Sequence, residues 1–310
     1  MSRALPASLL LPLLIVCAAE APLSSAPGTL DPEAPARFIL GGDTQKTMTL
    51  EFWRPHFDAE RQAVIRALAD ERPAFIVNSG DVVCHGGREA DWRRFCAENE
   101  ILFTRKIAYF PALGNHDYYG GSDQALRFRA AIFPHVGTRR WFEIRFKEVL
   151  IAVLDSNFDE LSPDQIRSQD LWLDGLLAAA EADPAILHVM LVSHHPPYTN
   201  AVGLPESAEV QEHFVSRLRP KVKVFFSGHV HSYERFDKRG VAFIVSGGGG
   251  GPTRDVETER PRHVDLYRGS RERPFHYCRF SLRDTTLVCD VLMLQKDDSW
   301  KRVDGFECAR

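Results

Sequence analysis

Short runs of apolar residues recur along the chain, and each run ends close to a Gly, Ser or Pro residue. Apolar runs of about four to eight residues that are bounded by turn-forming residues are typical of buried strands. The pattern therefore predicts strands over residues 37–40, 74–77, 107–110, 187–192 and 222–226.

Helical spacing of apolar residues fills the segments between these runs. Residues 55–71 place Val64, Ile65 and Leu68 on one face, and Pro73 ends the pattern. Similar patterns predict helices over residues 89–103, 122–133, 165–182 and 206–218. Further strands are expected over residues 141–146, 149–154, 275–282, 286–294 and 303–308. Alternating strands and helices followed by an antiparallel finish predict a mixed α/β architecture in one domain.

Composition and charge narrow the classes of partner. The chain has 310 residues, 44% of them hydrophobic and 26% charged, which is an ordinary globular balance. The formal net charge of −4 gives no indication of a nucleic acid or an anionic membrane as partner, and it leaves the oligomeric state open. An anionic substrate would have to be attracted locally by metal ions, because the overall field of the protein is weakly negative.

The N-terminal residues indicate export. A positive residue, Arg3, precedes the short apolar stretch 9–16, and small residues follow it, as in a secretory signal peptide. We expect a signal segment over residues 1–19, a linker rich in Pro, Ser and Ala over 20–35, and a domain over 36–310 that is periplasmic or secreted. A lipid anchor on Cys17 is a less favoured alternative, because Val16 fits that pattern poorly. No other stretch is long enough to span a membrane.

Five cysteines would remain after export, so at least one would be unpaired. Cys278 and Cys289 lie on neighbouring predicted strands and alternate onto the same face. A disulfide between them and two separate buried thiols are both compatible with this pattern.

The five strands predicted over residues 37–40, 74–77, 107–110, 187–192 and 222–226 share a local pattern at their ends. A Gly, Ser or Pro breaks each strand, and Asp, Asn or His follows: Gly41-Gly42-Asp43, Gly80-Asp81, Gly114-Asn115-His116-Asp117, Ser193-His194-His195-Pro196 and Gly228-His229-Val230-His231. Open α/β sheets bind ligands at the carboxyl ends of their strands, and imidazole is the commonest metal ligand in proteins. The series therefore predicts one shared metal site. The alternative is a set of five unrelated loops in which these residues serve as caps and turns.

The joint pattern resembles the calcineurin-like metallophosphoesterase superfamily, and the string from Gly228 to Arg235 is most similar to its purple acid phosphatase branch and the bacterial relatives of that branch. The resemblance runs from about Phe38 to Ser246 and extends into the Gly-rich stretch 246–251. It implies two facing mixed β-sheets flanked by helices, with a pair of metal ions (Fe, Zn or Mn) at one sheet edge. It also implies an exported metal-dependent phosphoesterase that hydrolyses phosphate mono- or diesters by attack of a metal-bridging hydroxide.

The same resemblance assigns the ligands. Asp81 corresponds to the bridging carboxylate of the family. Asp43 and His231 correspond to ligands of one metal ion, and Asn115, His194 and His229 correspond to ligands of the other. The neighbouring His195 occupies a variable position in the family and is expected only to line the pocket.

His116 lies next to the expected ligand Asn115. In the family this position stabilises the transition state or protonates the leaving oxygen, so His116 is the residue expected to act on the substrate. We expect Asp117 to hold the other ring nitrogen of His116 and to fix its tautomer. The alternative is a structural His116 that is hydrogen-bonded within a turn.

Two positions depart from the family pattern. Gln45 lies where the family often has a His ligand, and an amide oxygen is a poorer ligand for a transition metal than imidazole. The metal site around Asp43 is therefore expected to be weaker. Cys84 lies where purple acid phosphatases have a metal-bound Tyr, and we interpret it as a buried spacer, with metal binding as the alternative.

The sequence leaves open whether the residues after the Gly-rich stretch contact the substrate. Residues 253–273 contain six arginines and five acids, which indicates a solvated loop, although some of its arginines suit phosphate binding.

A rival function for the whole chain is a non-catalytic binding module on the same fold, as in the retromer subunit of the superfamily. A decayed site would have lost several ligands, whereas here only Gln45 departs from the usual metal ligands.

Overall fold

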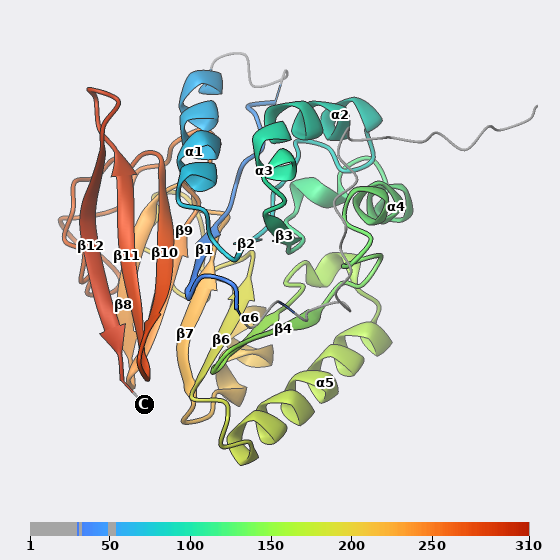
Figure 1. The fold of residues 1–310 in the computed structure, drawn as a ribbon, viewed down its shortest axis with the longest axis vertical. Helices are drawn as coiled ribbons and strands as arrows, with labels where there is room; N and C mark the ends of the chain where they lie inside the picture. Colours follow the sequence, from blue (N-terminus) through green and yellow to red (C-terminus); the bar gives the residue numbers. More distant parts are fainter. Residues whose placement is uncertain (1–29, 31–32, 49–53, 310) are drawn as a thin grey trace, which may run out of the picture.

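Two six-stranded β-sheets face each other in the computed structural model, which describes residues 30, 33–48 and 54–309 (Figure 1). The first sheet has the strand order β12-β11-β10-β1-β2-β3, and the second has the order β4-β5-β6-β7-β9-β8. The first sheet contains β1 (Arg37–Gly41), β2 (Phe75–Asn78), β3 (Ala108–Pro111), β10 (His276–Arg283), β11 (Thr286–Leu294) and β12 (Trp300–Cys308). The second contains β4 (Phe142–Phe146), β5 (Val149–Val153), β6 (His188–Ser193), β7 (Val222–Ser227), β8 (Tyr233–Lys238) and β9 (Val241–Ser246).

Helices flank the paired sheets on opposite sides (Figure 1). On one side are α1 (Asp58–Asp70), α2 (Glu89–Glu98), α3 (Glu100–Thr104) and α4 (Ser122–Ile132). On the other side are α5 (Pro163–Ala182) and α6 (Ala208–His213). Short 3-10 turns cover His116–Tyr118 (η2), Phe158–Glu160 (η3) and Val215–Arg217 (η4). The predicted fold class of two facing mixed sheets with flanking helices is confirmed.

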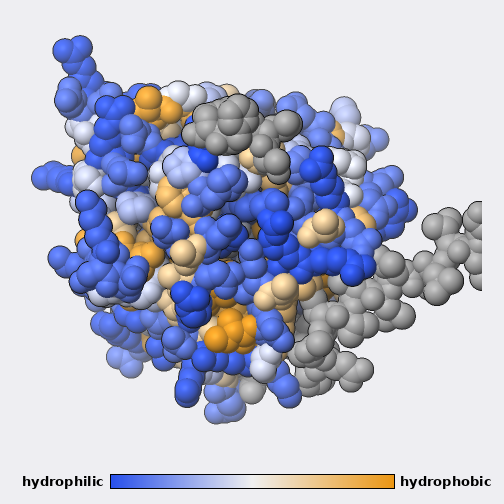
Figure 2. All heavy atoms as spheres, turned by 90° about the horizontal axis from the view of Figure 1, so that it is seen from above, coloured by the Kyte–Doolittle hydropathy of each residue, from blue (hydrophilic) through white to orange (hydrophobic). Residues whose placement is uncertain are grey.

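Strand β5 shows how the sequence fills both sides of the second sheet. Its odd-numbered residues, such as Ile151, join the large core between the sheets, whereas Leu150, Ala152 and Leu154 pack under α5 and α6. Side chains alternate across a strand with period two, so a strand buried on both faces reads as a continuous apolar run. On the face shown in Figure 2, hydrophilic residues predominate and hydrophobic ones form only small groups.

Most predicted elements appear within a residue or two of their expected bounds. The helix predicted over 89–103 is divided at Asn99 into α2 and α3, and the one predicted over 206–218 is divided into α6 and η4. Strand β8 was not predicted as a strand. It forms an edge of the second sheet, and its polar residues hide the alternation that marks other strands.

Residues 253–273 fold back beside β8. Arg273 is buried and pairs with Asp265 at 2.5 Å, and Arg271 pairs with Asp255 at 2.8 Å. The prediction of a solvated loop is therefore wrong for Arg273, whose guanidinium also donates to the Tyr233 carbonyl.

Cys278 and Cys289 are separate buried thiols on β10 and β11. Burial raises the pKa of the Cys289 thiol well above its ordinary value, as expected of a core residue.

The expected signal segment and most of the expected linker lie outside the described residues. Among the described residues, no helix has the length and apolar character needed to cross a bilayer.

The direction of the strands decides where the site forms. Strands β1, β2 and β3 run parallel to one another, and so do β5, β6, β7 and β9. Their carboxyl ends therefore open onto common edges, where the motif-bearing loops follow β1, β2, β3, β6 and β7. The topology thus brings five loops that are distant in the sequence to one place.

Candidate metal centre

Three of the predicted ligands have left-handed backbone conformations. The φ angles are 60° at Asp43, 55° at Asp81 and 66° at His229, and each residue follows a glycine. Such angles are uncommon outside glycine and cost about 1–3 kcal/mol each, so they persist only where the surrounding structure enforces them. Here they turn the chain sharply at the strand exits and direct three polar side chains into one space.

Glycines let the loops approach these carboxylates closely. A Cβ atom on Gly114 would lie 2.2 Å from Asp81 Oδ1, and one on Gly228 would lie 2.5 Å from Asp43 Oδ2. Both distances are far below van der Waals contact, so any side chain at either position would displace a carboxylate. Gly114 and Gly228 are thus steric requirements of the site.

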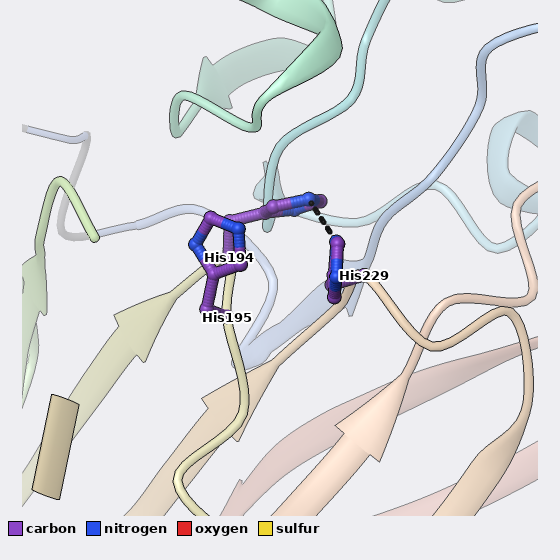
Figure 3. Close-up of side chains that lie close together, drawn as sticks. All are labelled: His194, His195 and His229. Carbon is purple, nitrogen blue, oxygen red and sulfur yellow. Dashed lines mark hydrogen bonds between the residues drawn. The ribbon is translucent and has the colours of Figure 1, made fainter. Parts of the chain in front are cut away.

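One group of donor atoms comes from three different loops. The Oδ1 atom of Asn115 lies 3.1 Å from His194 Nε2 and 3.2 Å from His229 Nδ1, and these two ring nitrogens are 3.2 Å apart. Figure 3 shows the two rings pointing toward each other from the ends of β6 and β7. Asp81 Oδ1 lies 3.4 Å from His194 Nε2.

A second group lies on the other side of Asp81. His231 Nε2 is 3.2 Å from Asp43 Oδ1. The side-chain amide nitrogen of Gln45 is 3.0 Å from Asp81 Oδ2 and 3.2 Å from His231 Nε2. The two oxygens of Asp81 therefore face two separate groups of donors.

These spacings fit a pair of metal ions. Donors at about 2.0–2.1 Å from a tetrahedral ion are about 3.3 Å apart, which is close to the separations seen in both groups. Asp43, Asp81 and His194 also place ligand atoms within 4.8 Å of one another, as do His194, His195 and His229. The residues present suit a dimetal centre in which Asp81 lies between the two ions.

Second partners orient the ligand rings and amides. The Nδ1 atoms of His194 and His231 lie 3.1 Å and 2.6 Å from the carbonyl oxygens of Ser79 and Pro252. A proton on each Nδ1 can donate to its carbonyl, which leaves the Nε2 lone pair directed at the other donors. The Asn115 amide nitrogen donates to the Tyr119 hydroxyl at 3.0 Å, so its oxygen points inward.

His116 has a different partner from the one predicted. Its Nδ1 lies 3.0 Å from the Cys84 carbonyl oxygen, and its Nε2 lies 4.0 Å from Asp81 Oδ2. The side chain of Asp117 instead accepts the backbone N–H groups of Val82, Val83 and Gly114 at 2.9–3.2 Å. The expectation that Asp117 holds the His116 ring is wrong, because its carboxylate ties the loop after β2 to the loop after β3. The expected catalytic role of His116 stays a prediction.

Burial and charge divide the histidines by protonation. Burial alone would lower the pKa of His194, but the adjacent Asp81 carboxylate outweighs it and raises that pKa to about 9. Burial also favours the neutral form of Asp81, and the charges of His194 and His116 nevertheless hold the Asp81 pKa well below its ordinary value. Burial and the nearby His194 lower the pKa of His195 to about 3 and that of His229 well below its ordinary value. Neutral imidazole is the form that binds metal, so His229 is ready to bind at neutral pH.

Sequence reasoning understated two residues. His195 lines the pocket as expected, and in addition its ring centroid lies 4.6 Å from that of His229 and its Nδ1 contacts the Ser156 hydroxyl at 2.9 Å. Gln45 was identified as a departure from a family pattern, and its contacts place it inside the second donor group. The doubled histidine in Ser193-His194-His195-Pro196 is the sequence signal for His195. No sequence signal indicates the direction of the Gln45 side chain.

Comparison with known families agrees with this geometry. The family model for calcineurin-like phosphoesterases matches residues 36–233. The chain belongs to the calcineurin-like phosphoesterase family. Its members are phosphoesterases, and this membership implies a dimetal centre. It does not identify the metals.

One curated relative and several solved structures are similar to this family member. A phosphoenolpyruvate phosphatase from Allium cepa is 25% identical over 297 residues, which cover 84% of this chain and 58% of that protein. The chain thus spans little more than half the length of that relative. A purple acid phosphatase from yellow lupin has a TM-score of 0.64 at 16% identity, over 92% of this chain and 55% of that one.

Two further structures match over most of their length. A dimetal phosphatase from Danio rerio has a TM-score of 0.59 at 16% identity, over 89% of this chain and 99% of that one. The protein described as GAP50, the anchor in the inner membrane complex of Plasmodium, has a TM-score of 0.67 at 16% identity, over 89% of both chains. At these identities the structures show a shared fold, confirming the expected likeness to purple acid phosphatases at that level.

Proposed function

We propose that this chain is an exported metal-dependent phosphoesterase that hydrolyses phosphate mono- or diesters. One observation carries the proposal: the two oxygens of Asp81 face two separate groups of donor atoms. Neighbouring donor atoms within each group lie about 3 Å apart, and five loops bring the groups together. Two bound metal ions would lower the pKa of a water molecule and clamp the phosphoryl oxygens. Fe, Zn and Mn are the candidate metals, because the donors are imidazole and oxygen.

In this proposal the residues of the chain share the remaining work. Asn115, His194 and His229 hold one ion and Asp43, His231 and Gln45 hold the other, with Asp81 between them. His116 donates a proton from Nε2 to the leaving oxygen, while the Cys84 carbonyl holds Nδ1. Asp117 keeps His116 in place indirectly, because it fixes both loops that surround the ring.

The experiment is a hydrolysis panel on aryl and alkyl phosphate monoesters and diesters, with chelated protein to which Fe, Zn or Mn is restored. His116→Asn serves as the test of the proton donor, and it should lower kcat about 10²–10⁴-fold for alkyl esters. The effect of His116→Asn should be much smaller for aryl esters, because a phenolate can leave without receiving a proton. Hydrolysis that chelation leaves unchanged would sink the proposal.

A non-catalytic binding module is the second candidate function, and the likeness to the Plasmodium anchor protein gives a reason to keep it. Against it, this chain retains all the expected metal ligands except at Gln45, together with a histidine beside them, which a purely structural surface would not need. A protein that binds metal tightly but hydrolyses no ester in the panel would favour the second candidate.

A further inference from the structure

Beside the donor groups lies a pocket of about 380 Å³, which is lined by Asn115, His229 and His195 on its inner side. This volume is near the lower end of the range of about 300–1,000 Å³ for ligand pockets, so it suits a small group. Because two expected metal ligands form part of its wall, a phosphate held at the centre would extend its alcohol portion into this pocket. The pocket's lining therefore bears on which esters the site accepts.

Four acidic side chains also line this pocket. Asp159 and Glu160 come from η3, Glu209 comes from the first turn of α6, and Glu206 precedes that helix. Glu206 already contacts His263 Nε2 at 2.5 Å. Asp159, Glu160 and Glu209 form no ion pair with another described residue. The pocket's lining, which consists of described residues, includes neither Lys nor Arg.

A buried acceptor without a donor points to the kind of ligand. Asn157 also lines the pocket and is only 5% exposed. Its amide nitrogen donates to the Leu113 carbonyl and to Asp155, but its Oδ1 has no hydrogen-bond partner among the described residues. A buried carbonyl-type oxygen without a donor costs about 1–3 kcal/mol, and a small movement of the Asn157 side chain toward the pocket would let a ligand N–H group remove that cost.

Aromatic rings complete the wall. Tyr119 packs against the His116 ring at 4.7 Å between centroids, with the ring planes tilted by 49°, and Phe158 precedes the two acidic residues of η3. Aromatic faces attract cations, and they do so together with carboxylates in sites for amines. The acidic residues, the unpaired oxygen and the rings therefore all favour the same ligand chemistry.

We propose that this pocket receives the alcohol portion of a phosphate ester that carries a protonated amine. The inference rests on the proposed phosphoesterase function and specifies its substrate class as small aminoalkyl phosphates. The phosphate is attracted by the metal centre and the amine by Asp159, Glu160 and Glu209, so the two ends of the substrate are recognised by opposite charges. An ester whose alcohol carries a negative charge, such as phosphoenolpyruvate, is disfavoured in the same pocket.

The test compares 2-aminoethyl phosphate with propyl phosphate, in which a methyl group replaces the ammonium. The kcat/KM ratio of the two esters is measured for the wild type, Asp159→Asn, Glu209→Gln and the double variant. Glu212→Gln is the matched control, because Glu212 is exposed on the same helix but does not line the pocket. Comparing ratios between variants cancels the different intrinsic reactivities of the two esters.

Each pocket variant should lower the amine-to-methyl ratio by about 1.4- to 5-fold, the range measured for exposed ion pairs, and added salt should lower it further in the wild type. The double variant should also raise kcat/KM for phosphoenolpyruvate, whereas Glu212→Gln should change neither quantity. An unchanged ratio in the double variant would overturn the inference even if both esters are hydrolysed.

Binding separates this inference from the proposed function. The affinities of the metal-loaded protein for the same two esters are measured by calorimetry. If the protein hydrolyses neither ester but binds the amine preferentially, and loses the preference in the double variant, the pocket is correct and the enzyme assignment is wrong. Equal affinities for both esters in the wild type would overturn the pocket.

Discussion

Replacing Gln45 tests how the second donor group works. Its amide nitrogen donates to Asp81 Oδ2 and approaches His231 Nε2, and its Oε1 is buried without a partner among the described residues. A half turn of the amide about its terminal bond exchanges these two atoms. The oxygen would then face Asp81 and His231, where it becomes a ligand of a metal ion bound between them.

The size of the effect follows from these contacts. In the metal-free protein, Gln45→Ala removes a hydrogen bond to a charged group, worth about 1.5–3 kcal/mol, and also removes an unpaired buried oxygen that costs about 1–3 kcal/mol. The two terms oppose each other, so metal-free stability should change by no more than about 2 kcal/mol in either direction. Metal binding, by contrast, loses a ligand, and its affinity should fall at least tenfold, or ~1.4 kcal/mol. Gln45→His should raise the affinity about tenfold, because imidazole is the better donor.

Calorimetric metal titration and thermal unfolding of the stripped protein separate the two quantities. Gln169→Ala is the control, because the buried Gln169 amide bonds both backbone groups of Asp155 at 2.8 and 2.9 Å. That variant should lose stability and keep its metal affinity. If Gln45→Ala behaves like Gln169→Ala, and Gln45→His does not tighten binding, the side chain only supports the fold and the ligand argument is refuted.

Three further predictions address the same centre. Asn115→Ala and His229→Ala should each abolish metal-dependent hydrolysis while circular dichroism stays native, and full turnover in either at saturating metal would contradict the ligand assignment. Metal binding at pH 7 should displace about one proton, because the raised pKa of His194, about 9, keeps its ring protonated without metal. The stability that the folded protein gains from this proton is present below about pH 6.5 and is lost as pH rises through about 9. Metal affinity should therefore increase over that pH window. Calorimetric titrations in buffers of different ionisation enthalpy measure the number of protons released. Iron-loaded protein should lack a tyrosinate absorption band, since Cys84 replaces the expected Tyr, and such a band in the wild type would refute the motif alignment.

Sequence reasoning worked where a single physical rule decides the outcome. The runs before Asp43, Asp81, Asn115 and His194 are apolar on both faces, so they could be recognised as buried strands, and parallel strands must end at a common edge. The meeting of five loops followed from these two facts.

Features that depend on tertiary contacts were out of reach. The left-handed φ angles at Asp43 and His229 arise because neighbouring loops enforce them, and no local pattern signals that constraint. The partner of His116 is a backbone carbonyl, which every residue has, so spacing favoured Asp117 instead. Likewise the polar edge strand β8 is stabilised by pairing with β9 and by the buried Tyr233, not by a periodic sequence.

The most direct test of the dimetal phosphoesterase measures metal content and hydrolysis on the same samples. Chelator-stripped protein is titrated with Mn, Zn or Fe, bound metal is counted by mass spectrometry, and ester hydrolysis is followed at each step, with Asp81→Asn alongside. The wild type should bind about two ions and gain activity with the second, because the chemistry needs both. Asp81→Asn, which keeps the shape of the bridge but removes its charge, should lose the second ion and the activity together. Hydrolysis by the stripped protein, or two bound ions with no ester hydrolysed, would contradict the account.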